Sequence, residues 1–104
     1  MVSTGIAAAS AALLVLSHEP DIEDILEKHY TRIAETELHI ISLAESNHPY
    51  EIEEVMRSIH SITFEAIPLE DQLPKELPET ERIRILNDFY NMKYEALKSL
   101  MAEL

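Results

Sequence analysis

The chain has 104 residues, a length that suits a single domain. It carries 20 Asp and Glu against 8 Lys and Arg, which gives a formal net charge of −12 at pH 7. This charge argues against binding to nucleic-acid phosphates or to anionic membrane surfaces, because both attract clustered basic side chains. The single glycine excludes glycine-rich phosphate loops, and the absence of cysteine excludes disulfides and thiolate metal sites.

Residues 1–17 contain no charged side chain, which is the sharpest change of composition in the chain. A secretory signal has a basic start and small residues after its apolar run, whereas here Lys and Arg are absent and the Ala-Ser block comes first. We predict a short helix over residues 4–16 that is apolar all round and therefore buried. Three interpretations remain open: a fourth helix of the same domain, an oligomer interface through Leu13, Leu14 and Leu16, or, not favoured, a membrane contact.

The longest periodic segment is residues 21–47, which lie between Pro20 and Pro49. Apolar side chains recur on one broad side when successive residues are turned by 100°, so the pattern predicts a helix and excludes a strand. Acidic residues follow both prolines, as expected at helix N-termini. Glu37 is the exception, since it falls inside the apolar stripe and would need a partner there.

Two further helices are predicted, over residues 49–67 and 78–103, with a proline-marked loop at residues 68–77. Together with residues 4–16 they indicate an all-α fold, a small up-and-down helical bundle in one domain spanning residues 1–104. The last helix has a second apolar strip beside its core face, which suggests a contact surface. The strip comprises Ile85, Phe89 and Met92.

A short connection between the first two long helices implies an antiparallel hairpin. Its register brings Glu37 within a turn of His60, and the returning last helix would bring Asn87 to the same level. Lys93 would lie about 10 Å further along the axis and is the poorer partner. We therefore predict a buried polar cluster of Glu37, His60 and Asn87, with an ordinary hydrogen-bonded core histidine as the alternative.

No residue pattern predicts a catalytic site or a cofactor. All five histidines lie in the first 60 residues, yet no two have the i, i+4 spacing that clamps a metal on one helix face. Glu51 and Glu54 have a Glu-x-x-Glu spacing, without a second acidic motif to complete a magnesium site. The metal content therefore stays open.

These observations favour a non-enzymatic, acidic helical module that works by oligomerisation or by binding a helical protein partner. The interface would use residues 1–17 and the second strip of the last helix. An alternative is a helical-bundle metal protein or metal-dependent enzyme with a Glu/His site. A further alternative is an acidic mimic of nucleic acid that blocks a basic protein. We expect a cytoplasmic protein that does not bind nucleic acid.

Overall fold

The computed structural model describes residues 21–104, and this part of the chain is helical with no strand. The predicted helix over residues 4–16, with Leu13, Leu14 and Leu16, lies outside the described residues. The elements are α2 (Ile22–Asn47), the 3-10 helix η1 (Pro49–Glu51), α3 (Ile52–Thr63), α4 (Leu69–Gln72) and α5 (Glu79–Ala102). The described chain is thus a helical bundle, as its periodicity predicts.

The ends of α2 follow from local chemistry. Asp21 caps the helix, because its Oδ1 accepts a hydrogen bond of 2.9 Å from the backbone N–H of Asp24. The helix ends at Asn47, where His48 leaves the helical conformation just before Pro49. These bounds differ from the predicted range 21–47 by one residue.

The second long helix is shorter than its predicted range of 49–67. Pro49 opens a single 3-10 turn, and α3 ends at Thr63, after which Phe64 is extended. An early end leaves the last carbonyl groups of α3 without helical partners. One of them, the carbonyl of Thr63, accepts a bond of 2.9 Å from Lys93 Nζ, which a longer helix would have precluded.

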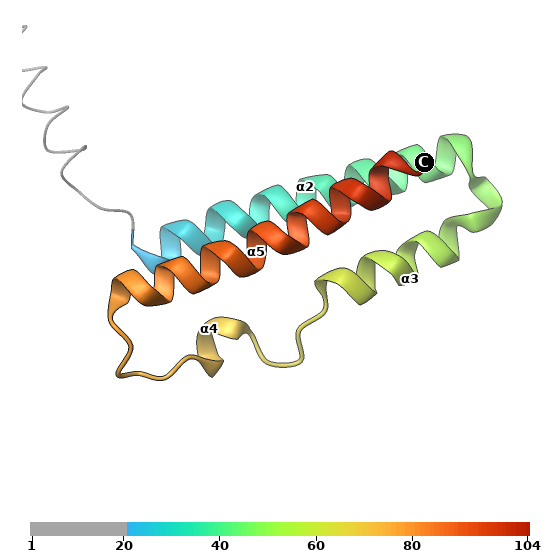
Figure 1. The fold of residues 1–104 in the computed structure, drawn as a ribbon. Helices are drawn as coiled ribbons and strands as arrows, with labels where there is room; N and C mark the ends of the chain where they lie inside the picture. The colour runs from blue at the N-terminus through green and yellow to red at the C-terminus, as the bar shows by residue number, and fades with distance from the viewer. Residues whose placement is uncertain (1–20) are drawn as a thin grey trace, which may run out of the picture.

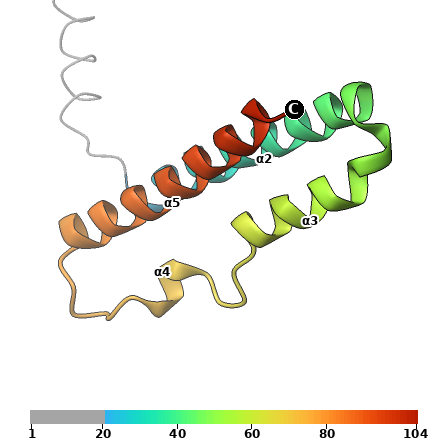
Figure 2. The same ribbon diagram turned by 45° about the vertical axis from the view of Figure 1, so that its right-hand side comes forward.

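The helices α2 and α5 lie side by side and run parallel, whereas α3 runs in the opposite direction (Figures 1 and 2). Hydrogen bonds fix the parallel register: His29 bonds to Asn87 near the start of the pair, and Asn47 bonds to the carbonyl of Leu104 at its end. After α3 the chain does not turn back at once. Residues 64–78, which include α4, continue toward the start of α2 before α5 begins (Figure 1).

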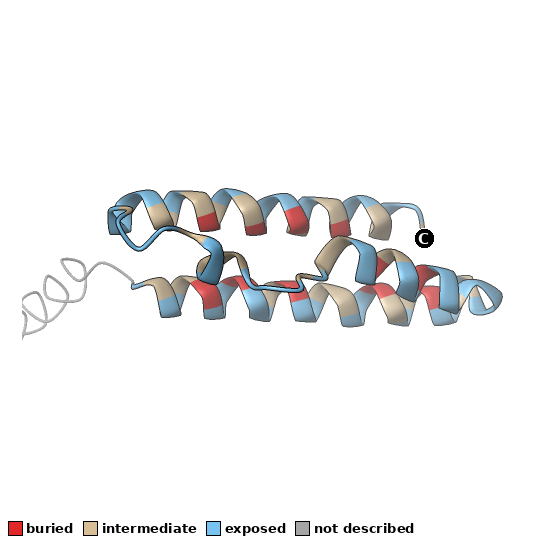
Figure 3. Ribbon diagram, turned by 90° about the horizontal axis from the view of Figure 1, so that it is seen from below, coloured by how far each residue is buried: buried red, intermediate tan, exposed pale blue. Residues whose placement is uncertain are grey.

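The core lies between α2 and α5, whose buried residues face each other, and α3 packs beside it (Figure 3). Its fully buried side chains Ile40, Leu86, Tyr90 and Leu97 are nearly inaccessible. The remaining buried apolar residues are Leu26, Ile33, Ala44, Val55 and Ile59. Among the helices of residues 21–104, none combines the length and the apolar run that crossing a bilayer requires.

Candidate functional site

One face of the α2–α5 pair is hollowed into a groove of about 1200 Å³. Its lining residues come from positions 24–35 of α2 and positions 80–91 of α5, and none comes from α3 or α4. Ile25 and Ile83 provide its apolar part, one from each wall. The groove is therefore a feature of the two parallel helices alone, on the face that α3 and α4 leave uncovered.

A row of four polar side chains crosses the groove. His29 is 8% exposed, and its Nε2 lies 2.7 Å from Asn87 Oδ1. Its other nitrogen, Nδ1, lies 3.3 Å from Arg32 Nη2, which also donates to Asn91 Oδ1 at 2.6 Å. A guanidinium group can only donate, so Nδ1 accepts and Nε2 carries the proton. One neutral tautomer of His29 therefore satisfies both contacts.

The guanidinium of Arg32 also lies over the ring of Tyr94, with Cζ 4.0 Å from the ring centroid. This contact is a cation–π interaction, which orients the planar group over the aromatic face. The Nε atom of Arg32 is buried and has no hydrogen-bond partner among the described residues. The Nε atom of Arg82, which does not line the groove, is likewise buried without a hydrogen-bond partner among the described residues.

The rim of the groove is acidic. Three carboxylates line it, those of Asp24, Glu27 and Glu35, and the only exposed ammonium group lining it among the described residues is that of Lys28. All four side chains come from the exposed side of α2. The groove thus combines an apolar wall, a row of hydrogen-bonding groups and a negatively charged edge.

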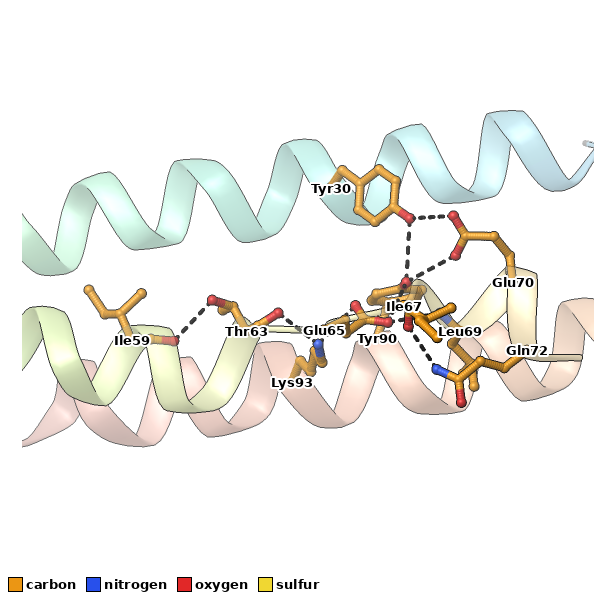
Figure 4. Close-up of polar contacts among 10 residues, drawn as sticks. All are labelled: Tyr30, Ile59, Thr63, Glu65, Ile67, Leu69, Glu70, Gln72, Tyr90 and Lys93. Carbon is orange, nitrogen blue, oxygen red and sulfur yellow. Dashed lines mark hydrogen bonds and ion pairs between the residues drawn. The ribbon is translucent and has the colours of Figure 1, made fainter.

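The opposite face of the α2–α5 pair is closed by a network that we call the polar latch (Figure 4). The hydroxyl of Tyr30 donates to Glu70 at 2.9 Å and lies 3.4 Å from that of Tyr90. The hydroxyl of Tyr90 lies within 3.4 Å of carboxylate oxygens of both Glu65 and Glu70. Lys93 completes the latch, because its Nζ is 2.9 Å from Glu65 Oε2.

The polar latch holds the segment after α3 and α4 against the two long helices. Lys93 is 7% exposed, so its charge is withdrawn from water and depends on Glu65 for compensation. Burial raises the pKa of Tyr90, and the nearby Tyr30 hydroxyl and Glu65 carboxylate raise it further. Burial also raises the pKa of Tyr30. Both hydroxyls therefore remain donors to the carboxylates well above neutral pH.

The structure does not bring the predicted cluster of Glu37, His60 and Asn87 together. Asn87 bonds to His29, eight residues or about 12 Å before Glu37 along α2. His60 is exposed and stacks on Phe64, with ring centroids 4.8 Å apart. Glu37 is half-buried and lines a cavity of about 250 Å³ beside the polar latch. The register predicted for the last helix was wrong, because it assumed that α5 turns back directly at the end of α3. In the structure, residues 64–78 first continue toward the start of α2.

Lys93, the partner that the predicted register made too distant for Glu37, lines the same small cavity as Glu37. Its ion pair is with Glu65 rather than with Glu37.

The three α5 residues predicted to form a second apolar strip differ in exposure. Met92 is 62% exposed, whereas Ile85 and Phe89 are half-buried. The ring of Phe89 packs edge-on against that of Tyr90, with centroids 5.1 Å apart, and borders the core. Only part of this strip is therefore available to a partner.

Apart from Asn87, which was predicted for a different cluster, several residues of the groove and the latch were not anticipated from the sequence. On α2 the polar pair His29 and Arg32, and on α5 the pair Asn87 and Asn91, have the spacing of neighbours on one helix face. That spacing is a signal that could have identified the polar row. Glu65 and Glu70 offer no such signal, since they flank Pro68 in a segment whose path the sequence does not predict.

No three His, Asp or Glu side chains of residues 21–104 gather closely enough to hold a metal ion. Glu51, one of the two carboxylates considered for magnesium, instead lies 3.0 Å from Nδ1 of His48. The metal-site alternative therefore finds no ligand set in the described part of the chain.

Comparison of the chain with family models, with curated proteins and with solved structures found no match.

Proposed function

We propose that the protein is a non-enzymatic interaction module that takes an α-helix of a partner protein into the groove between α2 and α5. The groove itself carries this proposal, because it is large, open along both helices and lined on both walls. In helix-in-groove recognition an amphipathic helix lays its apolar face into such a groove, where Ile25 and Ile83 would meet it.

The chemistry of the rim favours a basic partner. The carboxylates of Asp24, Glu27 and Glu35 would face the flanks of a docked helix, and the whole chain carries a charge of −12. Lys and Arg on those flanks would speed encounter and fix the orientation of the helix. A second copy of this chain carries the same negative charge, so we place a homo-oligomer behind a basic helical partner.

The test is a comparative capture of proteins by the immobilised full-length chain. The groove variant is Glu27→Lys/Glu35→Lys, which reverses two exposed charges of the rim. The matched control is Glu45→Lys/Glu76→Lys, which makes the same charge change at exposed positions outside the groove. We expect at least one protein to be captured by the wild type and the control and lost, by about tenfold, from the groove variant.

Circular dichroism melting would verify that both variants remain folded. An identical set of captured proteins for all three chains would overturn the proposal. Light scattering of the wild type after gel filtration identifies the remaining case: a discrete dimer that the groove variant alone changes would make the second copy the partner.

A further inference from the structure

We propose that His48 is a pH-sensitive clasp, which fastens the end of α5 to the corner between α2 and η1 when its ring is protonated. The clasp comprises His48, Glu51 and the backbone oxygen of Leu104. It lies away from the groove, whose lining residues occupy the first half of α2 and of α5. The clasp is therefore independent of the proposed docking of a partner helix.

Both ring nitrogens of His48 face oxygen atoms that can only accept a hydrogen bond. Nδ1 lies 3.0 Å from Oε2 of Glu51, and Nε2 lies 3.3 Å from the backbone oxygen of Leu104. An ionised carboxylate and a backbone oxygen have no proton to donate. A neutral imidazole carries one N–H, so it satisfies one of these contacts and turns a lone pair toward the other oxygen. Only the protonated ring donates to both.

His29 shows the opposite arrangement. Its Nδ1 faces a guanidinium N–H of Arg32, and its Nε2 donates to Asn87, so the neutral ring satisfies both contacts. A second proton on His29 would face a donor, whereas a second proton on His48 faces an acceptor. The two histidines at the two ends of α2 are therefore set for different protonation states.

The clasp adds to two contacts of Leu104 that do not depend on pH. The side chain of Leu104 packs against the core, and Nδ2 of Asn47 donates to the same backbone oxygen at 3.2 Å. Neither an apolar contact nor a carboxamide gains or loses a proton in this pH range. Deprotonation of His48 therefore loosens the end of α5 without releasing it.

The charged groups around this corner favour the protonated ring. The elements that meet there contribute carboxylates, namely Glu45 on α2, Glu51 on η1, Glu53 and Glu54 on α3, and Glu103 after α5. The nearest cations along α3 and α5 are Arg57 and Lys98, each about 9 Å of helix axis from the clasp, and Lys98 lies 3.6 Å from Glu95. The remaining titratable residue of η1, Tyr50, is fully exposed.

The sign of the pH dependence follows from these contacts. Protonation of the folded protein gains a second hydrogen bond and an ion pair with Glu51, neither of which forms in the unfolded chain. The contribution of the clasp to stability is therefore present at acid pH and is lost as the pH rises above neutrality. The side chains of His48 and Glu51 are 34% and 57% exposed, so water screens the pair and the effect is modest.

Urea unfolding of the full-length chain at pH 5.5 and at pH 8 tests the clasp. We expect His48→Gln to raise the unfolding equilibrium constant about threefold more at pH 5.5 than at pH 8. The control His39→Gln removes an exposed histidine of α2 and should have the same effect at both pH values. Each comparison is with the wild type at the same pH, so the titration of the other carboxylates cancels. An effect of His48→Gln that is equal at both pH values, or larger at pH 8, would overturn the proposal.

Glu51→Gln provides a second variant at an exposed position. Its amide can donate to Nδ1 of a neutral ring, so both contacts of His48 would then form without a second proton. We expect this variant to destabilise the protein more at pH 5.5 than at pH 8, as His48→Gln does. A Glu51→Gln variant that keeps the pH dependence of the wild type would show that Glu51 does not hold the proton on His48.

Nitrogen chemical shifts of the imidazole rings report directly which ring atoms carry protons. In spectra recorded at pH 7, we expect His48 to carry protons on both nitrogens in a larger share of molecules than His39. In the same spectra His29 should carry its proton on Nε2. A His48 ring in one fixed neutral tautomer would show that a single bond closes the corner, and would overturn the clasp.

Discussion

The two faces of the α2–α5 pair differ in how their polar side chains are covered and hydrogen-bonded. On one face, α3 and α4 cover the helices, and the polar latch joins α2, α3, α4 and α5 through Lys93, Glu65, Glu70 and the tyrosine hydroxyls. On the other, a row of polar side chains lies in a groove that no described element covers. In the latch the polar side chains bond to one another, whereas in the groove Arg32 Nε is buried and has no partner within residues 21–104. This difference is one observation behind the proposal that the second face binds a partner helix.

The largest expected effect is on the latch. Glu65→Ala leaves the buried ammonium group of Lys93 without its carboxylate, and we expect the free energy of unfolding to fall by about 3 kcal/mol. Urea unfolding followed by circular dichroism measures this loss. Lys93→Met/Glu65→Leu removes both charges and should recover most of it. A loss below about 1 kcal/mol for the single variant would show that water already solvates the pair.

A smaller effect is expected in the groove. Asn87→Leu deprives the buried Nε2–H of His29 of its acceptor, and an unsatisfied buried donor costs about 2 kcal/mol. The matched variant Asn91→Leu removes the acceptor of an exposed bond made by Arg32, which water can replace. Urea unfolding should therefore separate the two variants by more than about 1 kcal/mol. Equal losses would indicate that water reaches all the polar side chains that cross the groove.

The tyrosines of the latch should make the free energy of unfolding depend on pH. The pKa of Tyr90 is raised in the folded protein, so its contribution to stability is complete below the unfolded-state pKa of about 10 and is lost as the pH rises beyond it. Stability measured by urea unfolding should therefore decline from pH 9 to pH 11. Tyr90→Phe should cost about 1 kcal/mol at pH 8 and make this decline shallower. The same slope in both proteins would mean that Tyr90 is not responsible.

The sequence predicts the helices well because their signals are local. The apolar periodicity of α2 and the acidic residues after Pro20 and Pro49 define elements whose observed ends differ by few residues. The polar cluster was predicted less well because register is not local. The prediction placed Asn87 beside His60 and Glu37, whereas its partner in the structure is His29.

That error has one physical source, the path of residues 64–78. The side chain of Glu65 binds Lys93 and also accepts a bond from the backbone N–H of Leu69, which fixes the start of this segment against α5. The local sequence pattern around Pro68 does not predict such tertiary contacts. The groove was missed for the same reason, because predicting it requires knowing that α2 and α5 lie side by side and run parallel.

The smallest expected effect comes from comparing Arg32 of the groove with Lys93 of the latch. Arg32→Met keeps an unbranched apolar stem in the groove while removing the contact with the ring of Tyr94 and the bond to Asn91. Because Arg32 as a whole is half-buried and water can replace its exposed bond to Asn91, we expect a loss of only about 0.5–1 kcal/mol. Lys93→Met, with Glu65 left unpaired in the latch, should lose clearly more in the same urea titration. The opposite ranking would show that the groove, and not the latch, fixes α2 against α5, and would remove the basis for calling the groove a docking surface.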